Sequence, residues 1–270
     1  MGTSVPATWP HDVNTLCIDI GGTGLKAAVV DAAGVMVSPR IKRPTPYPCP
    51  PDTLVSELMA LASEVAGSAT GTSGYLRVSA GFPGLIRGGV VLEVPAFSRQ
   101  AYGGPPDSAL VAAWSGFPLA QTLAQTFHLP VTVVNDADMQ GAAVVEGTGI
   151  EFVMTLGTGV GTALFDAGQL LPHFELSHGP LRKGMTTDIA LGEASRRKLG
   201  TKHWRPLVRE AIDMFHDMLY YDRIYVGGGN AARLRVPDVG PRGMIIPNTA
   251  GILGGVRLWS LTAPPSRSPQ

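Results

Sequence analysis

Apolar and polar positions along this chain alternate between two kinds of block. Short apolar runs rich in β-branched residues predict strands, and most of them end in a polar or glycine-rich turn. Blocks with an apolar residue every three or four positions predict helices. The predicted strands are 16–20, 25–30, 35–37, 76–80, 85–86, 90–92, 131–134, 151–156, 162–165, 223–226 and 245–246, and the predicted helices are 53–66, 115–127, 137–146, 206–220 and 250–259. This mixture is typical of an α/β fold.

The stretch 131–138 places a carboxylate where a strand gives way to a helix. Four strand-forming residues lead into Asn135 and Asp136, and the next residues have a helical pattern. The Asp136 side chain is therefore expected at the carboxyl end of a strand, the edge at which open α/β sheets bind ligands. It is suited to act as a general base towards a hydroxyl, or to cap the helix. This stretch alone favours the cap.

Two glycine-rich turns have the same build. Residues 21–24 join the first two predicted strands, and residues 157–161 join two strands about 135 positions later. Backbone N–H groups in such turns can face phosphate, and in the first turn Thr23 adds a hydroxyl and Lys26 a charge. The repetition suggests a duplicated fold that grips one phosphate chain from both sides. A third strand enters the turn 227–230, a place for a nucleotide base or ribose.

Asp19 lies inside the first predicted strand, which is otherwise apolar. A buried carboxylate costs several kcal/mol unless it is paired, and a plain hairpin needs none. We therefore expect Asp19 to be functional and to meet a metal ion or a water bound to one.

Three other segments leave two interpretations each. The turn 81–84 alone is best explained as structural. His173, Glu175 and His178 resemble metal ligands, but the absence of cysteines nearby favours hydrogen bonding to a polar ligand. Eight lysines and arginines between residues 182 and 209 form either a solvated helix face or a path for a polyanion.

Composition limits the function classes. The 270 residues suffice for one large or two modest lobes, and 21 basic and 21 acidic residues give a net charge of zero. No global field therefore attracts nucleic acid or a membrane. Cys17 and Cys49 predict neither a disulfide framework nor a zinc site. Without a signal-like start or an apolar run of ~18 residues, the protein is expected to be cytoplasmic.

Five ordered motifs carry a family resemblance. They are Asp19-Ile-Gly-Gly-Thr-Gly-Leu-Lys26, Ala80-Gly-Phe-Pro-Gly84, Asn135-Asp-Ala-Asp138, Leu156-Gly-Thr-Gly-Val-Gly161 and Gly227-Gly-Gly-Asn230. Together they resemble the ROK family of sugar kinases. Segments 172–184, 199–204, 221–230 and 248–259 are similar to the polyphosphate glucokinase branch of that family, and the resemblance covers nearly all of residues 14–260.

The resemblance implies an actin-like, two-lobed α/β fold, with sheets of the ribonuclease-H kind and a central cleft. The N-terminal lobe would span residues 14–134 and the C-terminal lobe 135–260, with the last helix a candidate to pack back on the N-terminal lobe. Residues 1–13 and 261–270 are expected to be disordered.

The resemblance also implies roles for particular residues. Asp136 would be the base that deprotonates the sugar 6-hydroxyl, and Asp19 would meet Mg²⁺. The sugar would be held by Gly81, Asn135, Glu175, His178 and Asp188. The phosphates would be held by Gly21, Gly22, Thr23, Gly24, Lys26, Gly157, Thr158, Gly159 and Gly161, and a nucleotide by Gly228, Gly229 and Asn230.

The implied activity is phosphorylation of glucose to glucose 6-phosphate, with inorganic polyphosphate as donor and ATP as a candidate second donor. An ATP-dependent kinase of another hexose, such as mannose, and a non-catalytic sugar-binding or regulatory protein are the alternatives. A homodimer is expected from the branch, and no partnership with nucleic acid or membrane.

This chain departs from the family pattern in five respects. It lacks the cysteine-rich zinc motif that many members carry, so no zinc is expected. Ser177 stands in place of the usual glycine, Gly179 in place of a second histidine, and Ile189 in place of an acid. The usual Asn-Leu sugar contact is not evident in residues 96–98. These changes are expected to alter the sugar contacts.

Overall fold

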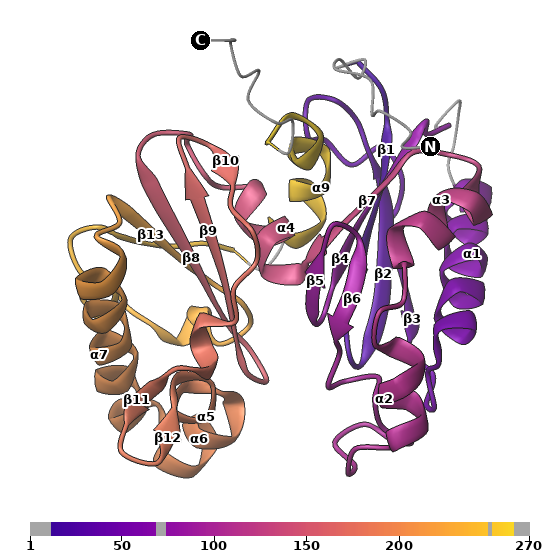
Figure 1. Ribbon diagram of the computed structural model, residues 1–270. Helices are drawn as coiled ribbons and strands as arrows, with labels where there is room; N and C mark the ends of the chain where they lie inside the picture. Colours follow the sequence, from indigo (N-terminus) through magenta and orange to yellow (C-terminus); the bar gives the residue numbers. More distant parts are fainter. Residues whose placement is uncertain (1–11, 69–73, 248–249, 262–270) are drawn as a thin grey trace, which may run out of the picture.

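The computed structural model describes residues 12–68, 74–247 and 250–261. These residues contain two five-stranded sheets, which lie side by side in Figure 1. The first sheet contains β1 (Thr15–Ile20), β2 (Gly24–Val30), β3 (Ile41–Pro44), β4 (Arg77–Phe82) and β7 (Val131–Asn135). The second contains β8 (Ile150–Leu156), β9 (Val160–Asp166), β10 (Gln169–Leu170), β13 (Arg223–Gly227) and β14 (Gly243–Ile245). Apart from residues 12, 13 and 261, the tails predicted to be disordered lie outside the described residues.

The two sheets share one plan. The strand orders are β3-β2-β1-β4-β7 and β10-β9-β8-β13-β14. In the first, β1 pairs antiparallel with β2 and parallel with β4; in the second, β8 pairs antiparallel with β9 and parallel with β13. The structure thus confirms the duplication that the repeated glycine turns suggested, and the carboxyl ends of β1 and β8 both lead into those turns.

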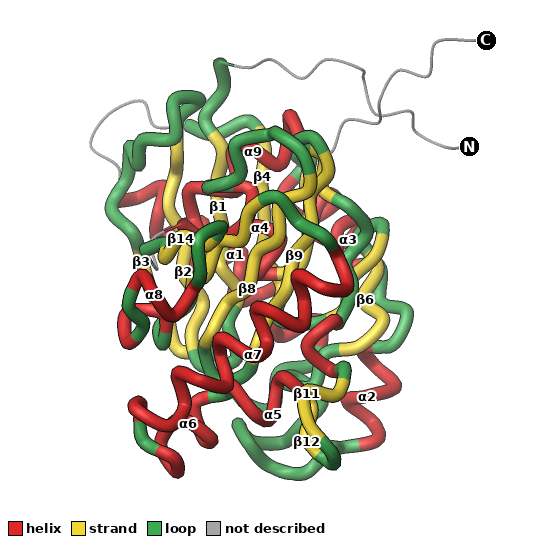
Figure 2. Tube along the Cα trace, turned by 90° about the vertical axis from the view of Figure 1, so that its left-hand side faces the viewer, coloured by secondary structure: helices red, strands yellow, loops and turns green. Residues whose placement is uncertain are grey.

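Helices cover the outer face of each sheet. On the first sheet, α1 (Pro51–Ser68) and α3 (Leu119–Phe127) bury leucines such as Leu58 and Leu123 in a core with the strands. On the second, α7 (Thr201–Leu219) buries Trp204 and Val208 against Phe152 of β8. Figure 2 shows α7 running across the outer face of the second sheet.

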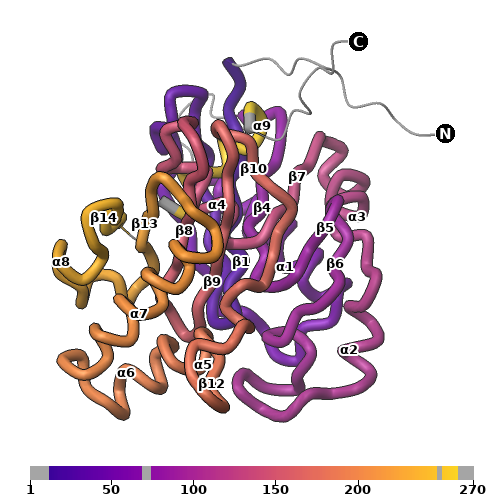
Figure 3. Tube along the Cα trace, turned by 60° about the vertical axis from the view of Figure 1, so that its left-hand side comes forward, coloured from indigo at the N-terminus to yellow at the C-terminus, as the bar shows by residue number. Residues whose placement is uncertain are grey.

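Two further helices, α4 (Asp136–Ala142) and α9 (Ala250–Leu261), pack against each other between the sheets (Figure 3). Their buried side chains share one core with Cys17 of β1 and with Val153 and Phe165 of the second sheet. Gly254 of α9 allows the close approach, because a Cβ there would lie 1.7 Å from the backbone oxygen of Met139. α9 also contacts β1 and β4, and Ser79 donates a hydrogen bond to the Gly255 carbonyl at 2.6 Å.

Three predicted helices have an end that lies four or five residues away in the structure. The helix predicted at 115–127 begins four residues later, at Leu119, because Gly116, with a left-handed φ of 76°, separates α3 from the preceding α2 (Ser108–Trp114). The helix predicted at 137–146 ends at Ala142. The helix predicted from Pro206 begins five residues earlier, at Thr201, and runs through that proline.

Short elements complete the described chain: β5 (Leu85–Arg87), β6 (Val90–Glu93), β11 (Pro180–Arg182), β12 (Met185–Thr186), α5 (Thr187–Leu191), α6 (Glu193–Leu199), α8 (Val236–Val239) and the 3₁₀ turns η1 (Leu176–His178) and η2 (Ala231–Arg233). No helix in the described part of the chain combines the length and apolarity needed to cross a membrane.

Candidate active site

A cleft of about 610 Å³ is lined by turns that follow strands of both sheets. The predicted site residues that line it are Gly21, Gly22, Asn135, Asp136, Gly157, Thr158, Gly159, Gly161, Glu175, His178 and Asp188. Eight others lie outside that lining: Asp19, Thr23, Gly24, Lys26, Gly81, Gly228, Gly229 and Asn230. Residues more than 150 positions apart in the sequence thus meet around one cavity.

Asn135 and Asp136, at the junction of β7 and α4, have different roles. Asn135 is the N-cap of α4: its side-chain oxygen accepts the Ala137 N–H at 2.8 Å, and its own N–H donates to Asp138 at 3.3 Å. Asp136 is the first residue of the helix and lines the cleft. Its Oδ1 also accepts the Ala137 N–H at 2.8 Å. Because Asn135 is the cap, the Asp136 side chain is available to a ligand.

The surroundings of Asp136 raise its pKa to about 7. Burial among protein atoms is the largest cause, and the negative charge of Asp19 adds to it. The side chain still meets the solvent that fills the cleft. A carboxylate whose pKa lies near neutral pH is suited to accept a proton from a hydroxyl group.

The first glycine turn is braced from outside the cleft. Gly21 donates its N–H to the Gly24 carbonyl at 3.1 Å. The hydroxyls of Thr45 and Tyr47 donate to the carbonyls of Gly21 and Gly22, each at 2.6 Å. With their carbonyls held on the far side, Gly21 and Gly22 form part of the cleft wall.

Asp19 is paired with Lys26, whose Nζ lies 2.6 Å from Asp19 Oδ2. Both side chains are about one-third exposed, at 27% for Asp19 and 33% for Lys26. The pair gives the carboxylate a partner within the β1–β2 hairpin, and Asp19 is close enough to influence the pKa of Asp136. Among the described residues, no group of three or more His, Cys, Asp or Glu is arranged to hold a metal ion.

The second glycine turn is braced by Asp188 of α5. Asp188 Oδ1 accepts the Val160 N–H at 2.7 Å, and a Cβ on Gly159 would lie 2.3 Å from that oxygen. Gly161 is equally confined, since its Cβ would lie 2.6 Å from the Thr155 hydroxyl. Asp188 therefore lines the cleft with one oxygen already engaged, while its neighbour Ile189 is 61% exposed.

Glu175 and His178 lie on the same wall of the cleft, 3.8 Å apart between Oε2 and Nε2. Burial opposes ionisation of Glu175, but the charge of the nearby His173 outweighs it and holds the pKa of Glu175 below its ordinary value. An ionised carboxylate beside an exposed imidazole can accept and donate hydrogen bonds to a polyhydroxylated ligand. The described residues around them form no metal cluster, so the geometry favours hydrogen bonding.

Gly81 and the turn 227–230 support the cleft from behind. Gly81 lies in β4, where a Cβ would come within 3.3 Å of the Asp136 Cα, so the glycine allows α4 to start close to the sheet. Asn230 donates from its side chain to the Gly157 carbonyl at 3.1 Å and from its backbone to the Leu156 carbonyl at 2.9 Å. The third glycine turn thus braces the second.

Ion pairs account for most of the basic run between residues 182 and 209. Arg182 pairs with Glu210, Arg196 and Arg197 with Glu193, and Arg205 and Arg209 with Asp238. Within the described part of the chain, Lys183, Lys198 and Lys202 form no ion pair. These residues therefore form mainly a solvated surface of paired charges rather than a path of unpaired cations for a polyanion. Trp204, in the same segment, is buried.

Sequence reasoning missed the loop between β6 and α2. It places Arg99 and Tyr102 in the cleft wall, and Arg99 Nε donates to the Pro95 carbonyl at 2.8 Å. The Tyr102 ring lies against Gly22, and its hydroxyl is 3.4 Å from the Thr158 hydroxyl on the opposite turn. A glycine- and proline-rich segment with one tyrosine carries no signal in the sequence for this position.

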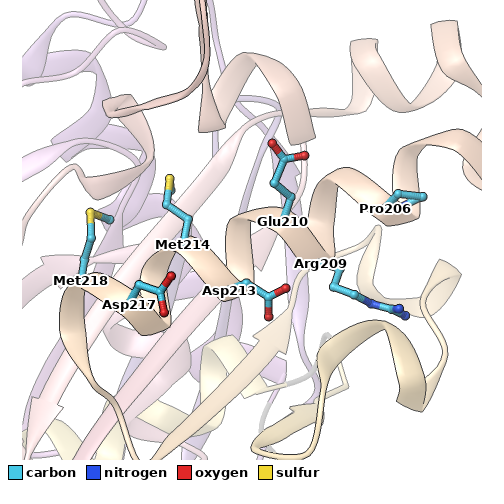
Figure 4. Close-up of a pocket in the computed structure, with 7 residues that line it drawn as sticks. All are labelled: Pro206, Arg209, Glu210, Asp213, Met214, Asp217 and Met218. Atoms are coloured by element: carbon cyan, nitrogen blue, oxygen red, sulfur yellow. The ribbon is translucent and has the colours of Figure 1, made fainter.

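A second hollow, of about 550 Å³, lies on the outer face of α7 (Figure 4). Its lining is Pro206, Arg209, Glu210, Asp213, Met214, Asp217 and Met218, all from that one helix. Because groups from different elements do not converge there, we assign the site to the cleft.

Comparisons with known proteins agree with this geometry. The family model described as the ROK family matches residues 15–172. A polyphosphate glucokinase of Mycobacterium tuberculosis is 27% identical over 252 residues, which are 88% of each chain. A solved inorganic polyphosphate/ATP-glucomannokinase from Arthrobacter sp. superposes with a TM-score of 0.75 at 27% identity, over 93% of this chain and 99% of that one. A ROK family glucokinase from Streptomyces griseus, at 18% identity and a TM-score of 0.66 over 91% of this chain and 98% of that one, shares the fold.

Proposed function

This chain belongs to the ROK family, and we propose that it is a hexokinase-type phosphotransferase that converts glucose to glucose 6-phosphate. The relatives named polyphosphate glucokinase and polyphosphate/ATP-glucomannokinase support glucose as the acceptor and polyphosphate, with ATP, as donors. The fold is the actin-like one that its structural neighbours in the family share.

One observation carries the proposal: Asp136 lies in the cleft between two duplicated glycine turns, with a pKa raised to about 7. Its carboxylate takes the proton of the sugar 6-hydroxyl as the oxygen attacks the terminal phosphoryl of the donor. The bond from that phosphorus to the bridging oxygen breaks, and the shortened donor leaves with the bond's electron pair. Phosphoryl transfer depends on positioning and charge stabilisation, and the two glycine turns that line the cleft would supply backbone N–H groups for both.

Mg²⁺ belongs to the same proposal. This ion usually takes one or two carboxylates and completes its octahedron with substrate phosphates and water. Asp19, beside the first glycine turn and partly exposed, fits that requirement as the protein ligand, with Lys26 as its counter-ion before the metal arrives. When bound, the ion would neutralise charge on the donor phosphates.

Support for polyphosphate as donor comes from the relatives, not from the basic run. Five of its eight cations already pair with acids. The cleft wall offers Arg99 as a cation near the glycine turns. Mannose is a second candidate acceptor, because the relative from Arthrobacter sp. is named a glucomannokinase. A homodimer, expected from the branch, is tested by sedimentation of the purified chain.

The test is the initial rate of hexose phosphorylation by the purified protein with Mg²⁺ and either polyphosphate or ATP. Asp136→Asn should lower kcat by about 10²–10⁴-fold, the usual contribution of a positioned base. Asp217→Asn makes the same chemical change on the exposed face of α7 and should match the unsubstituted protein (Figure 4). Equal rates for both variants, or no turnover of any hexose by the unsubstituted chain, would refute the proposal.

A further inference from the structure

A buried row of ionisable side chains runs from the start of α4 to the wall of the cleft. Asp138 of α4 is 2% exposed and His173 is 5% exposed, whereas Glu175 reaches the cleft. The proton transfer described above uses neither Asp138 nor His173. Burying charged groups is costly unless they are paired, so the presence of both in the interior needs an explanation.

The two ring nitrogens of His173 face two different carboxylates. Nδ1 lies 3.1 Å from Asp138 Oδ1 in a hydrogen bond. Nε2 lies 3.4 Å from Glu175 Oε1, an ion contact without the alignment of a hydrogen bond. Nε2 is buried and has no hydrogen-bond partner within the described residues. Nδ1 therefore has a hydrogen-bond partner, whereas Nε2 faces the Glu175 carboxylate without forming a hydrogen bond to it.

The neighbouring carboxylates favour the protonated, cationic form of the ring. Burial alone would lower the pKa of His173, but the hydrogen bond to Asp138 and the negative charges of Asp138 and Glu175 outweigh it and raise the pKa to about 9. Both nitrogens then carry a proton and act as donors. A cation between two carboxylates also keeps Glu175 ionised, the state in which it accepts hydrogen bonds.

Asp138 connects this row to the catalytic base. Its other oxygen, Oδ2, accepts the N–H of Asn135, the residue just before Asp136. The same carboxylate therefore fixes the first turn of α4 and orients His173. Asp138 and His173 are 35 positions apart and belong to segments that follow different sheets.

We propose that His173 is a positioning residue that fixes the sugar-binding carboxylate of Glu175 relative to the base Asp136, with Asp138 holding one ring nitrogen and Glu175 held by the other. This inference rests on the proposed function, since it assigns Glu175 to the sugar. Sugar hydroxyls that draw Glu175 into place would complete the second hydrogen bond of the ring. Orientation of the acceptor hydroxyl against the base would follow from that contact.

Two substitutions test the two ring nitrogens of His173 separately. In His173→Asn, the amide nitrogen can take the place of Nδ1 and keep the contact with Asp138, but the side chain is too short to reach Glu175. In His173→Gln, the amide nitrogen can take the place of Nε2 towards Glu175. The glucose KM of His173→Asn should rise about tenfold or more, the usual effect of losing a hydrogen bond to a charged group. His173→Gln should recover part of the affinity, and the donor KM should stay unchanged in both variants.

A double-substitution cycle with Glu175→Gln distinguishes positioning from a general structural role. If His173 acts through Glu175, His173→Asn should add little to the glucose KM when Glu175→Gln is already present. Multiplicative effects of the two substitutions would overturn the proposal. An unchanged glucose KM in His173→Asn would also overturn it, even with a lowered melting temperature.

Calorimetric titration with glucose, in the absence of the phosphoryl donor, tests the role of His173 independently of the phosphotransferase activity. If the unsubstituted chain binds glucose but does not phosphorylate it, the proposed activity fails while the binding affinities of the same variants still test His173. Weaker binding in His173→Asn than in His173→Gln supports the proposal, and equal binding in both variants refutes it. A chain that does not bind glucose at all removes both the activity and the inference.

Discussion

Asn135 and Asp136 are adjacent polar residues with different roles. Asn135 is the last residue of β7, and Asp136 is the first residue of α4. The extended backbone of Asn135 turns its side chain back onto the N–H groups of α4, whereas Asp136 already has helical geometry and faces the cleft. Burial and the nearby Asp19 then raise the pKa of Asp136 to about 7. At the scale of single residues, backbone conformation decides which side chain caps and which meets a ligand.

The pH dependence of kcat/KM for glucose should report this raised pKa. A base acts when deprotonated, so kcat/KM should increase with pH and level off above about 7, the pKa of Asp136. The measurement is an initial-rate series from pH 5 to 9 at saturating donor and Mg²⁺. The exposed variant Asp217→Asn should show the same rising limb. A profile that is already flat at pH 5 would show that Asp136 titrates near its ordinary value or is not the base.

At the scale of elements, the contact between α4 and α9 supports the helix that begins with Asp136. α4 carries Asp136 at its first position, and α9 supports α4 from the side opposite the second sheet. Gly254 makes this contact possible, because the backbone of α4 occupies the space that a larger residue would need. The last helix of the chain is thus part of the support for a site whose residues lie far earlier in the sequence.

Gly254→Ala should destabilise the protein by about 1–3 kcal/mol, the usual cost of overpacking, because its Cβ would lie 1.7 Å from the Met139 carbonyl oxygen. Gly251→Ala, in the same helix, is the matched control. A Cβ at Gly251 meets nothing within 4 Å, so the change should be neutral or stabilise by about 0.5–1 kcal/mol. Urea-unfolding midpoints of both variants give the comparison. Equal midpoints would mean that α9 does not pack this closely against α4.

At the scale of the whole molecule, the cleft exists because two copies of one sheet plan face each other across α4 and α9 (Figure 1). Each copy offers a glycine turn, and the structure braces each turn from behind: the first with Thr45 and Tyr47, the second with Asp188 and Asn230. Tyr102 is the side chain that reaches from the first half to the Thr158 hydroxyl of the second. It therefore lies between the two turns that are proposed to hold the donor phosphates.

Tyr102→Phe should raise the KM of the phosphoryl donor by less than about tenfold, the range expected for one neutral hydrogen bond, and leave the glucose KM unchanged. The reason is that the hydroxyl contacts the second glycine turn, whereas Glu175 and His178 form the predicted sugar wall. Tyr220→Phe, at a tyrosine that is 76% exposed, is the control. A selective rise in glucose KM would instead place Tyr102 at the sugar.

The sequence by itself determined the local part of this protein. Apolar periodicity predicted most strands and helices, because each pattern depends on residues within a few positions of one another. Repetition of the glycine turns predicted the duplication, and residues 131–138 located Asp136 at a strand end. The helix was predicted to span 115–127 because the apolar pattern there is favourable. That pattern does not show the left-handed conformation at Gly116, which prevents the helix from starting so early.

Only the tertiary structure decided which residues share the cleft. The path of a loop places Arg99 and Tyr102 in the cleft wall. Packing against α4 and β8 places Gly81 and Asn230 behind that wall. The pairing of Arg182, Arg205 and Arg209 with acids 28 to 33 positions away was likewise invisible in the sequence. The buried contacts of His173 with Asp138 and Glu175 are the clearest case. Local pattern cannot show them, because the charge and burial of an imidazole depend on which distant segments the fold brings around it.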